Sequence, residues 1–312
     1  MKKILLAVAI AFALCAPALR AAPTAFSFLK FVSSARAAGL SGSFVTFEND
    51  ASSLYYNPAT IWTVETKPLS VTFFKHVLDI NSGNAAYVFN VPDVGKFAVS
   101  AVFSSYGSFN RSDVQGNVLG DFGAQDVAFG GSFSNEIDSN FYYGVTLKFL
   151  YSGMDDLSST AFAVDAGLFY KLKDGRTNLG VSILNAGAQL STFDGSAARL
   201  PLDVRLGASH RMKGMPLLVN ASIHHLADPD TKFLERFRNF SVGGELSLGE
   251  YIKLRLGYDN YFRNFTGAEQ NKGLTGISLG AGIATDKISL DYGLAGLGSS
   301  ISVHRFSVNL EI

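Results

Sequence analysis

A strict alternation of apolar and polar side chains marks the middle of the chain, between Asn140 and Lys171. In its first half, every second residue is apolar: Phe141, Tyr143, Val145, Leu147, Phe149 and Tyr151. A short loop with Asp155 and Asp156 follows, and the alternation then resumes from Phe162 to Tyr170. A period of two predicts β-strands rather than helices. Two such runs joined by a loop predict a hairpin.

The two runs are about twice as long as an ordinary strand of roughly 5–6 residues. Their length matches the roughly 9–11 residues that a tilted strand needs to cross a bilayer. One face is apolar and rich in aromatic rings, whereas the other carries small, polar and charged residues. This pattern is typical of the wall of a transmembrane β-barrel, with lipid outside and a polar lumen inside.

The same alternation recurs along the chain and predicts fourteen strands. We expect them near 69–78, 84–92, 96–106, 122–134, 140–151, 160–172, 176–184, 202–211, 216–225, 240–248, 251–259, 274–284, 287–293 and 301–312. All even-numbered connections are short, and the clearly long ones, 107–121, 185–201, 227–239 and 260–273, are all odd-numbered. Short periplasmic turns and long extracellular loops are expected of an outer-membrane barrel. The predicted fold class is therefore all-β, a transmembrane antiparallel barrel of about 14 strands.

The first 66 residues lack the alternation. Residues 1–22 combine Lys2 and Lys3 with a short apolar run and small residues, which predicts a secretory signal peptide. Residues 23–66 are mostly small, with a few aromatics, and suit packing against protein better than contact with lipid. We expect them to form an N-terminal plug segment in the lumen or across its periplasmic mouth, before a barrel domain at 67–312. A periplasmic leader is the alternative.

Composition agrees with dispersed apolar strands, because 47% of residues are hydrophobic and only 17% are charged. After residue 25 there is no run of 18 apolar residues that predicts a helical span. Without Lys2, Lys3 and Arg20, the 26 basic residues fall to 23 against 26 acidic ones, a net charge of −3. Nothing here indicates nucleic acid as a partner. Cys15 is the only cysteine, so no disulfide is expected in the mature chain.

With apolar residues facing lipid, the strands direct charges of both signs toward the lumen. These are Lys148, Asp165, Lys171, Asp203, Arg205, Glu245, Lys253, Arg255, Asp291, Arg305 and Glu311. An unpaired charge in a dry interior is costly. We therefore expect ion pairs within the lumen, or between the wall and the N-terminal segment. A selective ion pathway would show one dominant sign.

No catalytic residue, cofactor or metal site is predicted. His224 and His225 are neighbours in an expected strand, so their side chains should point to opposite faces and not share a metal. The sequence contains no His-Glu-x-x-His motif and no phosphate-binding loop. We do not expect an enzyme.

The loop at 227–239 contains a second candidate site. Residues Thr231 to Arg238 have helical spacing, with Phe233, Leu234 and Phe237 able to form one apolar side among charged residues. This predicts a short amphipathic helix at the extracellular rim. The apolar side would contact a hydrophobic ligand or a partner protein, or else pack on its own barrel.

Two blocks of the N-terminal segment, Ser34–Phe44 and Asn49–Ala59, carry a family resemblance. The second contains Leu54-Tyr55-Tyr56-Asn57-Pro58. Together with Leu184-Asn185-Ala186-Gly187 and the barrel end, they resemble the PorV/PorQ family, outer-membrane barrels related to the long-chain fatty acid transporter (FadL) family. The resemblance implies a fourteen-stranded barrel with an N-terminal segment inside it. It also implies a role in type IX protein secretion, in delivering or anchoring exported proteins.

The main prediction is therefore an outer-membrane barrel that handles exported proteins, with secretion-system proteins, cargo and outer-membrane lipid as partners. The alternative is a FadL-like passive transporter of hydrophobic small molecules, and a third interpretation is a structural barrel without transport. A transporter would use an apolar pocket beside the plug. The candidate ligand-facing residues are Phe44, Phe47, Leu54, Tyr55 and Tyr56, with Asn57 and Pro58 beside them. Packing of the plug is the other interpretation of these side chains.

Overall fold

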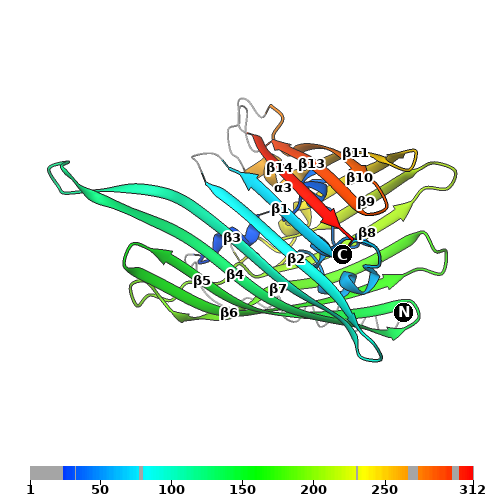
Figure 1. Ribbon diagram of the computed structural model, residues 1–312, viewed down its shortest axis with the longest axis horizontal. Coiled ribbons are helices and arrows are strands. Elements are labelled where there is room, and N and C mark those ends of the chain that lie inside the picture. Colours follow the sequence, from blue (N-terminus) through cyan, green and yellow to red (C-terminus); the bar gives the residue numbers. More distant parts are fainter. Residues whose placement is uncertain are drawn as a thin grey trace.

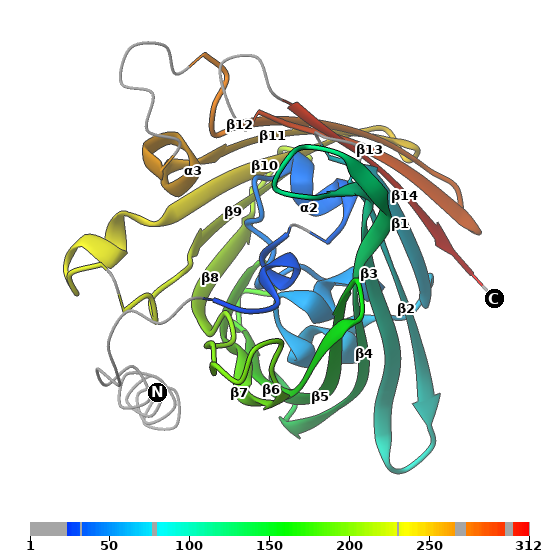
Figure 2. The ribbon, with the colours of Figure 1, turned by 90° about the vertical axis from the view of Figure 1, so that its left-hand side faces the viewer.

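Fourteen antiparallel strands close into one barrel (Figures 1 and 2). The computed structural model describes residues 24–31, 33–76, 80–229, 231–265, 273–296 and 302–311, so the predicted signal peptide lies outside the described residues. The strands are β1 (Leu69–Lys75), β2 (Asn81–Val91), β3 (Gly95–Ser112), β4 (Val118–Asp138), β5 (Phe141–Met154), β6 (Leu157–Lys171), β7 (Thr177–Ser191), β8 (Asp203–Arg211), β9 (Leu217–Ile223), β10 (Phe240–Leu248), β11 (Ile252–Asp259), β12 (Ile277–Ala284), β13 (Ile288–Gly296) and β14 (Ser302–Leu310). Each strand pairs with its sequence neighbours, and β1 pairs with β14, which removes both sheet edges. The predicted fold class and strand number are confirmed.

The alternating side chains face the predicted sides of the wall, apolar ones outward and polar ones inward. On β5, Val145, Leu147 and Phe149 are exposed, whereas Thr146 and Lys148 between them are buried. The same holds around the barrel, where Leu, Ile, Val and Phe side chains form most of the exposed outer face. A closed barrel with an apolar exterior is the architecture of bacterial outer-membrane proteins. The chain is therefore an outer-membrane barrel.

Short helical turns are the other regular elements of the described chain. Four lie before β1: η1 (Ser27–Lys30), α2 (Ala35–Gly39), η2 (Ala51–Tyr55) and η3 (Pro58–Thr63). Two lie in connections after β9 and β11: η5 (Glu235–Arg238) and α3 (Asn260–Phe265). Side chains of Ser34, Asp50 and Asn57 cap α2, η2 and η3, as small polar residues do before helical turns. None of the described helices is long and apolar enough to cross a bilayer.

The predicted long loop at 107–121 is wrong, because most of it is strand. Strand β3 runs to Ser112 and β4 starts at Val118, with a bulge between Ser105 and Ser108. Phe109 and Phe122 lie opposite each other, with ring centroids 5.5 Å apart. The bulge interrupts the alternation and hides the extension, as bulges do. Pairing of β4 with β5 ends at Ala124, so the hairpin continues beyond it as two strands alone.

The predicted loop at 185–201 is also shorter than expected, since β7 continues to Ser191. Asn185 has a positive φ of 60°, and its backbone N–H donates to Asp165 Oδ1 at 2.7 Å. The pairing of β6 with β7 shifts register between Val164 and Ala166, beside Asn185. The extra residue reverses the side-chain alternation, so the run after Asn185 does not read as a strand.

Candidate functional site

Residues 33–64 lie inside the ring of strands (Figure 2). Helix α2 contacts β11 to β14, whereas η2 and η3 contact β1 to β6 on the other side. Wall glycines allow the close approach. A Cβ on Gly293 would lie 2.3 Å from the Ala35 carbonyl oxygen, and one on Gly144 would lie 2.4 Å from the carbonyl carbon of Pro58. The N-terminal segment thus packs backbone against backbone on two opposite parts of the wall.

A buried ion network joins α2 to the wall. Arg36 pairs with Glu245 of β10 through two hydrogen bonds of 2.9 and 2.7 Å, and with Asp50 at 3.3 Å. Glu245 also pairs with Arg255 at 2.7 Å, and Arg255 with Asp291 at 2.7 Å. Burial by itself would lower the pKa of Arg36, but Glu245 and Asp50 raise it above its usual value. Burial raises the pKa of Asp50, against the opposing effect of Arg36.

Further ion pairs link strands to one another and to the segment. Lys148 lies 2.6 Å from Asp165, and Arg205 lies 2.6 Å from Asp203, both within the wall. Lys171 of β6 pairs with Glu48 of the N-terminal segment at 2.6 Å. Ion pairs within the wall and ion pairs between the wall and the N-terminal segment, the two kinds predicted from the sequence, are therefore both present. These inward charges neutralise one another, so they do not form a surface of one sign.

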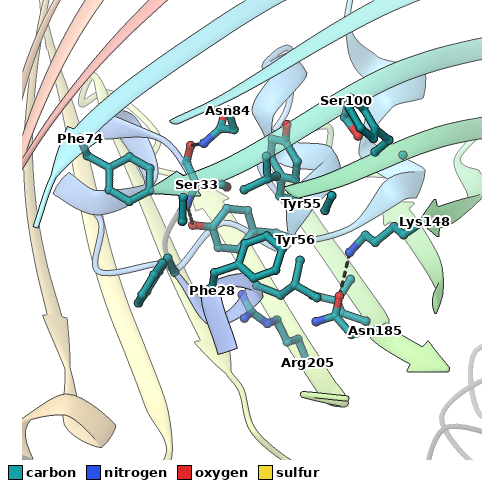
Figure 3. Close-up of a pocket in the computed structure, with 18 residues that line it drawn as sticks. Phe28, Ser33, Tyr55, Tyr56, Phe74, Asn84, Ser100, Lys148, Asn185 and Arg205 are labelled. Carbon is teal, nitrogen blue, oxygen red and sulfur yellow. Dashed lines mark hydrogen bonds between the residues drawn. The ribbon is translucent and has the colours of Figure 1, made fainter. Parts of the chain in front are cut away.

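A cavity lies between the N-terminal segment and the inner faces of β1 to β5, β7 and β8 (Figure 3). It contains about 670 Å³ of space between atoms, including space open to solvent. Its aromatic lining comes from Phe28, Phe31, Tyr55, Tyr56 and Phe74. Its polar lining comes from Ser33, Asn84, Ser100, Ser104, Lys148, Asn185 and Arg205. The lining thus combines aromatic rings with polar side chains, and its two cationic side chains already have carboxylate partners.

Only two of the predicted ligand-facing residues line this cavity, Tyr55 and Tyr56. Phe44 and Phe47 are buried and stacked with ring centroids 4.2 Å apart, and Tyr56 meets Phe44 edge-on at 5.4 Å. Leu54 is fully buried in a separate cluster against β2 and β3. Phe44, Phe47 and Leu54 therefore hold the segment together.

Asn57 and Pro58 fix the segment to the wall instead of lining the cavity. The Asn57 side-chain amide donates to the carbonyl oxygens of Val45 at 3.1 Å and Leu168 at 3.0 Å. Its Oδ1 accepts from the backbone N–H of Ala59 at 3.1 Å, which caps η3. One fully buried side chain thus connects two parts of the segment with β6.

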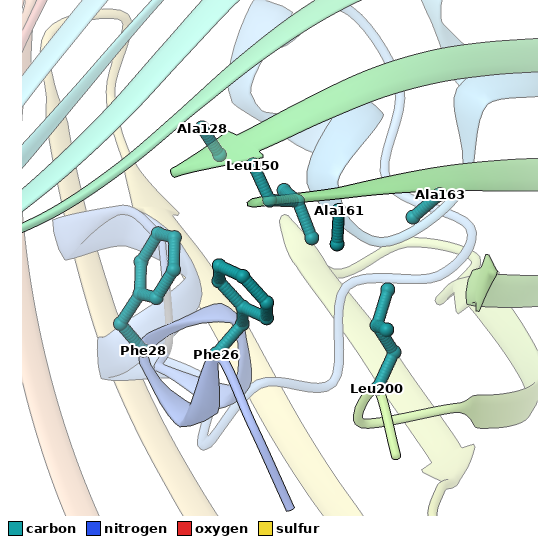
Figure 4. Packing of buried hydrophobic residues seen from close by; sticks show 7 residues of the cluster. All are labelled: Phe26, Phe28, Ala128, Leu150, Ala161, Ala163 and Leu200. Carbon is teal, nitrogen blue, oxygen red and sulfur yellow. The ribbon is translucent and has the colours of Figure 1, made fainter. Parts of the chain in front are cut away.

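Sequence reasoning missed the aromatic residues before residue 32. Phe26 and Phe28 are buried against inward-facing residues of β4, β5 and β6 (Figure 4). The backbone N–H of Ala25 donates to the carbonyl oxygen of Arg199 at 2.9 Å. This contact holds the stretch beside the connection after β7, at the end of the barrel predicted to be extracellular. Sequence periodicity reports only local structure, and the wall residues that these phenylalanines contact lie 100 or more positions away. The sequence pattern therefore does not predict the contact.

The rim loop differs from the predicted helix. Its regular part is only the four-residue 3-10 turn η5 (Glu235–Arg238). Phe233 and Phe237 lie edge to face at 5.6 Å, and Phe233, Leu234 and Phe237 are exposed by 48%, 78% and 36%. Such exposure does not support packing of the three side chains on their own barrel. The structure places them together, away from the cavity lining.

The histidine prediction needs a correction. Strand β9 ends at Ile223, so His224 and His225 lie beyond it, and their rings are 4.8 Å apart rather than on opposite faces. His225 has a positive φ of 57°, which turns the chain. Burial lowers the pKa of His225 to about 4, although Asp203 opposes the shift. In the part of the chain that the structure describes, no cluster of three or more His, Cys, Asp or Glu could hold a metal ion.

Solved structures with a similar fold include two toluene transporters and a FadL homologue. The toluene transporter TbuX of Ralstonia pickettii has a TM-score of 0.61 at 12% identity and covers 91% of this chain and 99% of its own. A FadL homologue of Pseudomonas aeruginosa has a TM-score of 0.55 at 14% identity, and the match covers 89% of this chain and 98% of its own. The toluene transporter TodX of Pseudomonas putida has a TM-score of 0.57 at 12% identity, and the match covers 88% of this chain and 95% of its own.

These likenesses extend over nearly the whole chain, and at such low identity they show a shared fold. No model of a protein family matches the chain, and no curated protein matches it. The fold is therefore that of FadL-like barrels. The narrower resemblance to PorV/PorQ finds no support among these matches and stays a prediction.

Proposed function

We propose that this chain is a passive transporter that admits hydrophobic small molecules through the outer membrane. The observation that carries the proposal is the aromatic cavity enclosed by the barrel wall and the N-terminal segment. Rings of the N-terminal segment and of Phe74 on the wall offer an apolar surface, and the two cationic side chains of the lining, Lys148 and Arg205, have carboxylate partners within the protein. Ligand sites for apolar molecules have this kind of lining.

The fold adds support, because barrels of similar architecture are named as toluene transporters and as a FadL homologue. The inward charges fit the same role. They form internal ion pairs with both signs present, and they do not make the one-sign lining of an ion pathway. Uncharged apolar solutes are the class that such an interior favours.

Uptake measurements with a cavity-filling variant test the proposal. Ser100 lines the cavity, so Ser100→Phe should reduce uptake of toluene and of a medium-chain fatty acid by cells that rely on this barrel. The neighbouring Val99 is 53% exposed on the lipid face, and Val99→Phe is the matched control. We expect the control to transport like the parent. Equal uptake by cells with and without the barrel would overturn the proposal.

The secretion prediction is tested by a different measurement. A mild-detergent pull-down of the tagged mature protein would recover secretion components or exported proteins in stoichiometric amounts if the barrel serves type IX secretion. Recovery of an apolar small molecule without a protein partner would favour transport. The similar solved structures favour transport, and none of them is named as a secretion component.

A further inference from the structure

The segment Thr231–Arg238, called the rim segment below, lies over the lipid side of the wall. In Figure 2, which looks along the barrel from the predicted extracellular end, η5 and α3 lie outside the ring of strands. They do not cover the lumen, where the N-terminal segment packs. A side chain exposed on η5 therefore faces the zone where the outer leaflet surrounds the barrel.

The rim segment is continuous with the lipid-facing surface of β10 and β11. Phe240 follows it after one intervening residue, and the Phe240 ring lies 6.3 Å from Tyr258 of β11 on the outer face. Farther along the same face, Val242 is 39% and Leu256 is 60% exposed. The Asn260 side chain donates to the Arg238 carbonyl oxygen at 2.8 Å and ties η5 to the start of α3. The apolar band thus extends from the wall onto the rim.

The chemistry of the rim segment is amphipathic and cationic. Phe233, Leu234 and Phe237 supply the apolar part. Lys232, Arg236 and Arg238 against Glu235 give a formal charge of three minus one, or +2. Arg236 donates to the carbonyl oxygens of Thr231 and Leu226, both at 3.0 Å, and so braces the turn, while Lys232 and Arg238 are exposed. Aromatic and aliphatic residues beside basic ones are what interfacial segments use on anionic lipid.

We propose that the rim segment is a lipid-binding site. It inserts Phe233, Leu234 and Phe237 among acyl chains of the outer leaflet and pairs Lys232 and Arg238 with anionic lipid headgroups. The proposal does not depend on what the lumen transports. It commits to an anionic lipid as the occupant, because the segment lies over the bilayer, is continuous with the lipid-facing band and carries positive charge.

Fluorescence quenching by brominated lipids tests the insertion. Trp62 is the only tryptophan, so Trp62→Phe provides a dark background for Phe233→Trp. The protein is placed in vesicles of phosphatidylglycerol and phosphatidylcholine with brominated acyl chains. Leu256→Trp on the lipid-facing wall is the positive reference, and Val114→Trp at the fully exposed tip of the β3–β4 hairpin is the negative one. We expect Phe233→Trp to lose intensity as Leu256→Trp does.

Charge reversal tests the headgroup part. Lys232→Glu with Arg238→Glu should reduce the phosphatidylglycerol that stays bound after extraction, by several-fold relative to the parent. The matched control is Lys173→Glu with Lys213→Glu, the same charge change on turns at the opposite end of the barrel. Folded barrels migrate faster in unheated gels, which checks assembly of every variant.

The outcomes separate the possible occupants. Quenching of Phe233→Trp with selective loss of bound lipid supports the site. An unquenched Phe233→Trp beside a quenched Leu256→Trp overturns it, as does equal lipid loss from both charge-reversed pairs. Recovery of a stoichiometric protein partner that protects Phe233→Trp from quenching would assign the rim segment to protein binding instead and also overturn the lipid site.

Discussion

Asn57 shows how much one side chain contributes to placing the N-terminal segment. It is fully buried and bonds Val45, Leu168 and Ala59 at the same time. Asn57→Ala leaves the two carbonyl oxygens without this donor and removes a helix cap. We therefore expect the free energy of unfolding to fall by roughly 1–3 kcal/mol. Urea unfolding of the protein in vesicles measures it.

Asn135→Ala is the matched control for this substitution. Its side-chain amide also donates to a carbonyl oxygen, that of Val94 at 2.7 Å, but at an exposed position near the end of β4 where water can replace it. For Asn135→Ala we expect the free energy of unfolding to change by no more than about 0.5 kcal/mol. A loss at Asn57 no larger than at Asn135 would mean that burial of the three bonds contributes nothing.

His225 determines the direction in which the stability of the folded protein changes with pH. Its pKa in the folded protein is lowered to about 4 from the ordinary 6.5, because burial disfavours the charged ring. The unfolded chain therefore binds the proton first as pH falls, and stability decreases between about pH 6.5 and pH 4. Above that window the neutral ring carries no penalty. The decrease from this group is on the order of 2–3 kcal/mol across the window.

His225→Gln removes the titrating ring and should flatten the pH dependence of the urea midpoint over that range. The titratable and charged groups that face His225 are Asp203, Arg205, His224, Asp259 and Tyr261, and they stay in place in this variant. His304→Gln on the exposed outer face of β14 is the control. An unchanged pH profile for His225→Gln would show that burial of this ring is not what shapes the profile.

At the scale of elements, Arg36 is the main polar link between α2 and the wall. Arg36→Met leaves Glu245 with Arg255 alone and Asp50 without its cation, and breaking a buried pair costs roughly 3–5 kcal/mol. Lys171→Met breaks the pair with Glu48, in which both side chains are about one-third exposed, and should cost at most about 1 kcal/mol. Hydrogen exchange at Ala37 and Ala38 should rise in the first variant only. Equal exchange in both variants would contradict this role of the network.

The β3–β4 hairpin extends beyond Ala124 without pairing with a third strand. No strand other than its own partner pairs with residues 108–122, so replacing them by a short turn should leave assembly unchanged. Gel migration of unheated protein measures assembly. Phe129→Arg on the lipid-facing wall is the contrasting variant, because a cation there costs roughly 2–4 kcal/mol near the bilayer midplane. Failed assembly of the shortened hairpin would show that the extension guides folding.

The same two elements show how far sequence reasoning reaches. A period of two is a property of each strand alone, so the strand number and the lipid-facing side follow from the sequence. Bulges at Ser105 and Asn185 shift the period, and the pattern then reads as loop. The cavity was harder to predict, because its lining joins Phe28 and Phe31 to Phe74, Ser100 and Arg205. Only barrel closure and the path of the N-terminal segment bring these residues together.

At the scale of the molecule, strand number and the N-terminal segment have to be considered together. Wall side chains can fill the interior of a barrel of about eight strands, and wider barrels enclose space that something else must occupy. Here residues 33–64 pack against both sides of the wall. We therefore expect the intact protein to show no steady ion conductance in a planar bilayer, whereas a variant without residues 33–64 should conduct. Leu40→Glu, which keeps every strand but places a charge where a fully buried leucine meets Gly243, should give intermittent openings. Conductance by the intact protein equal to that of the deletion variant would mean that the segment does not close the lumen, and would favour a path for polar solutes over transport of hydrophobic ones.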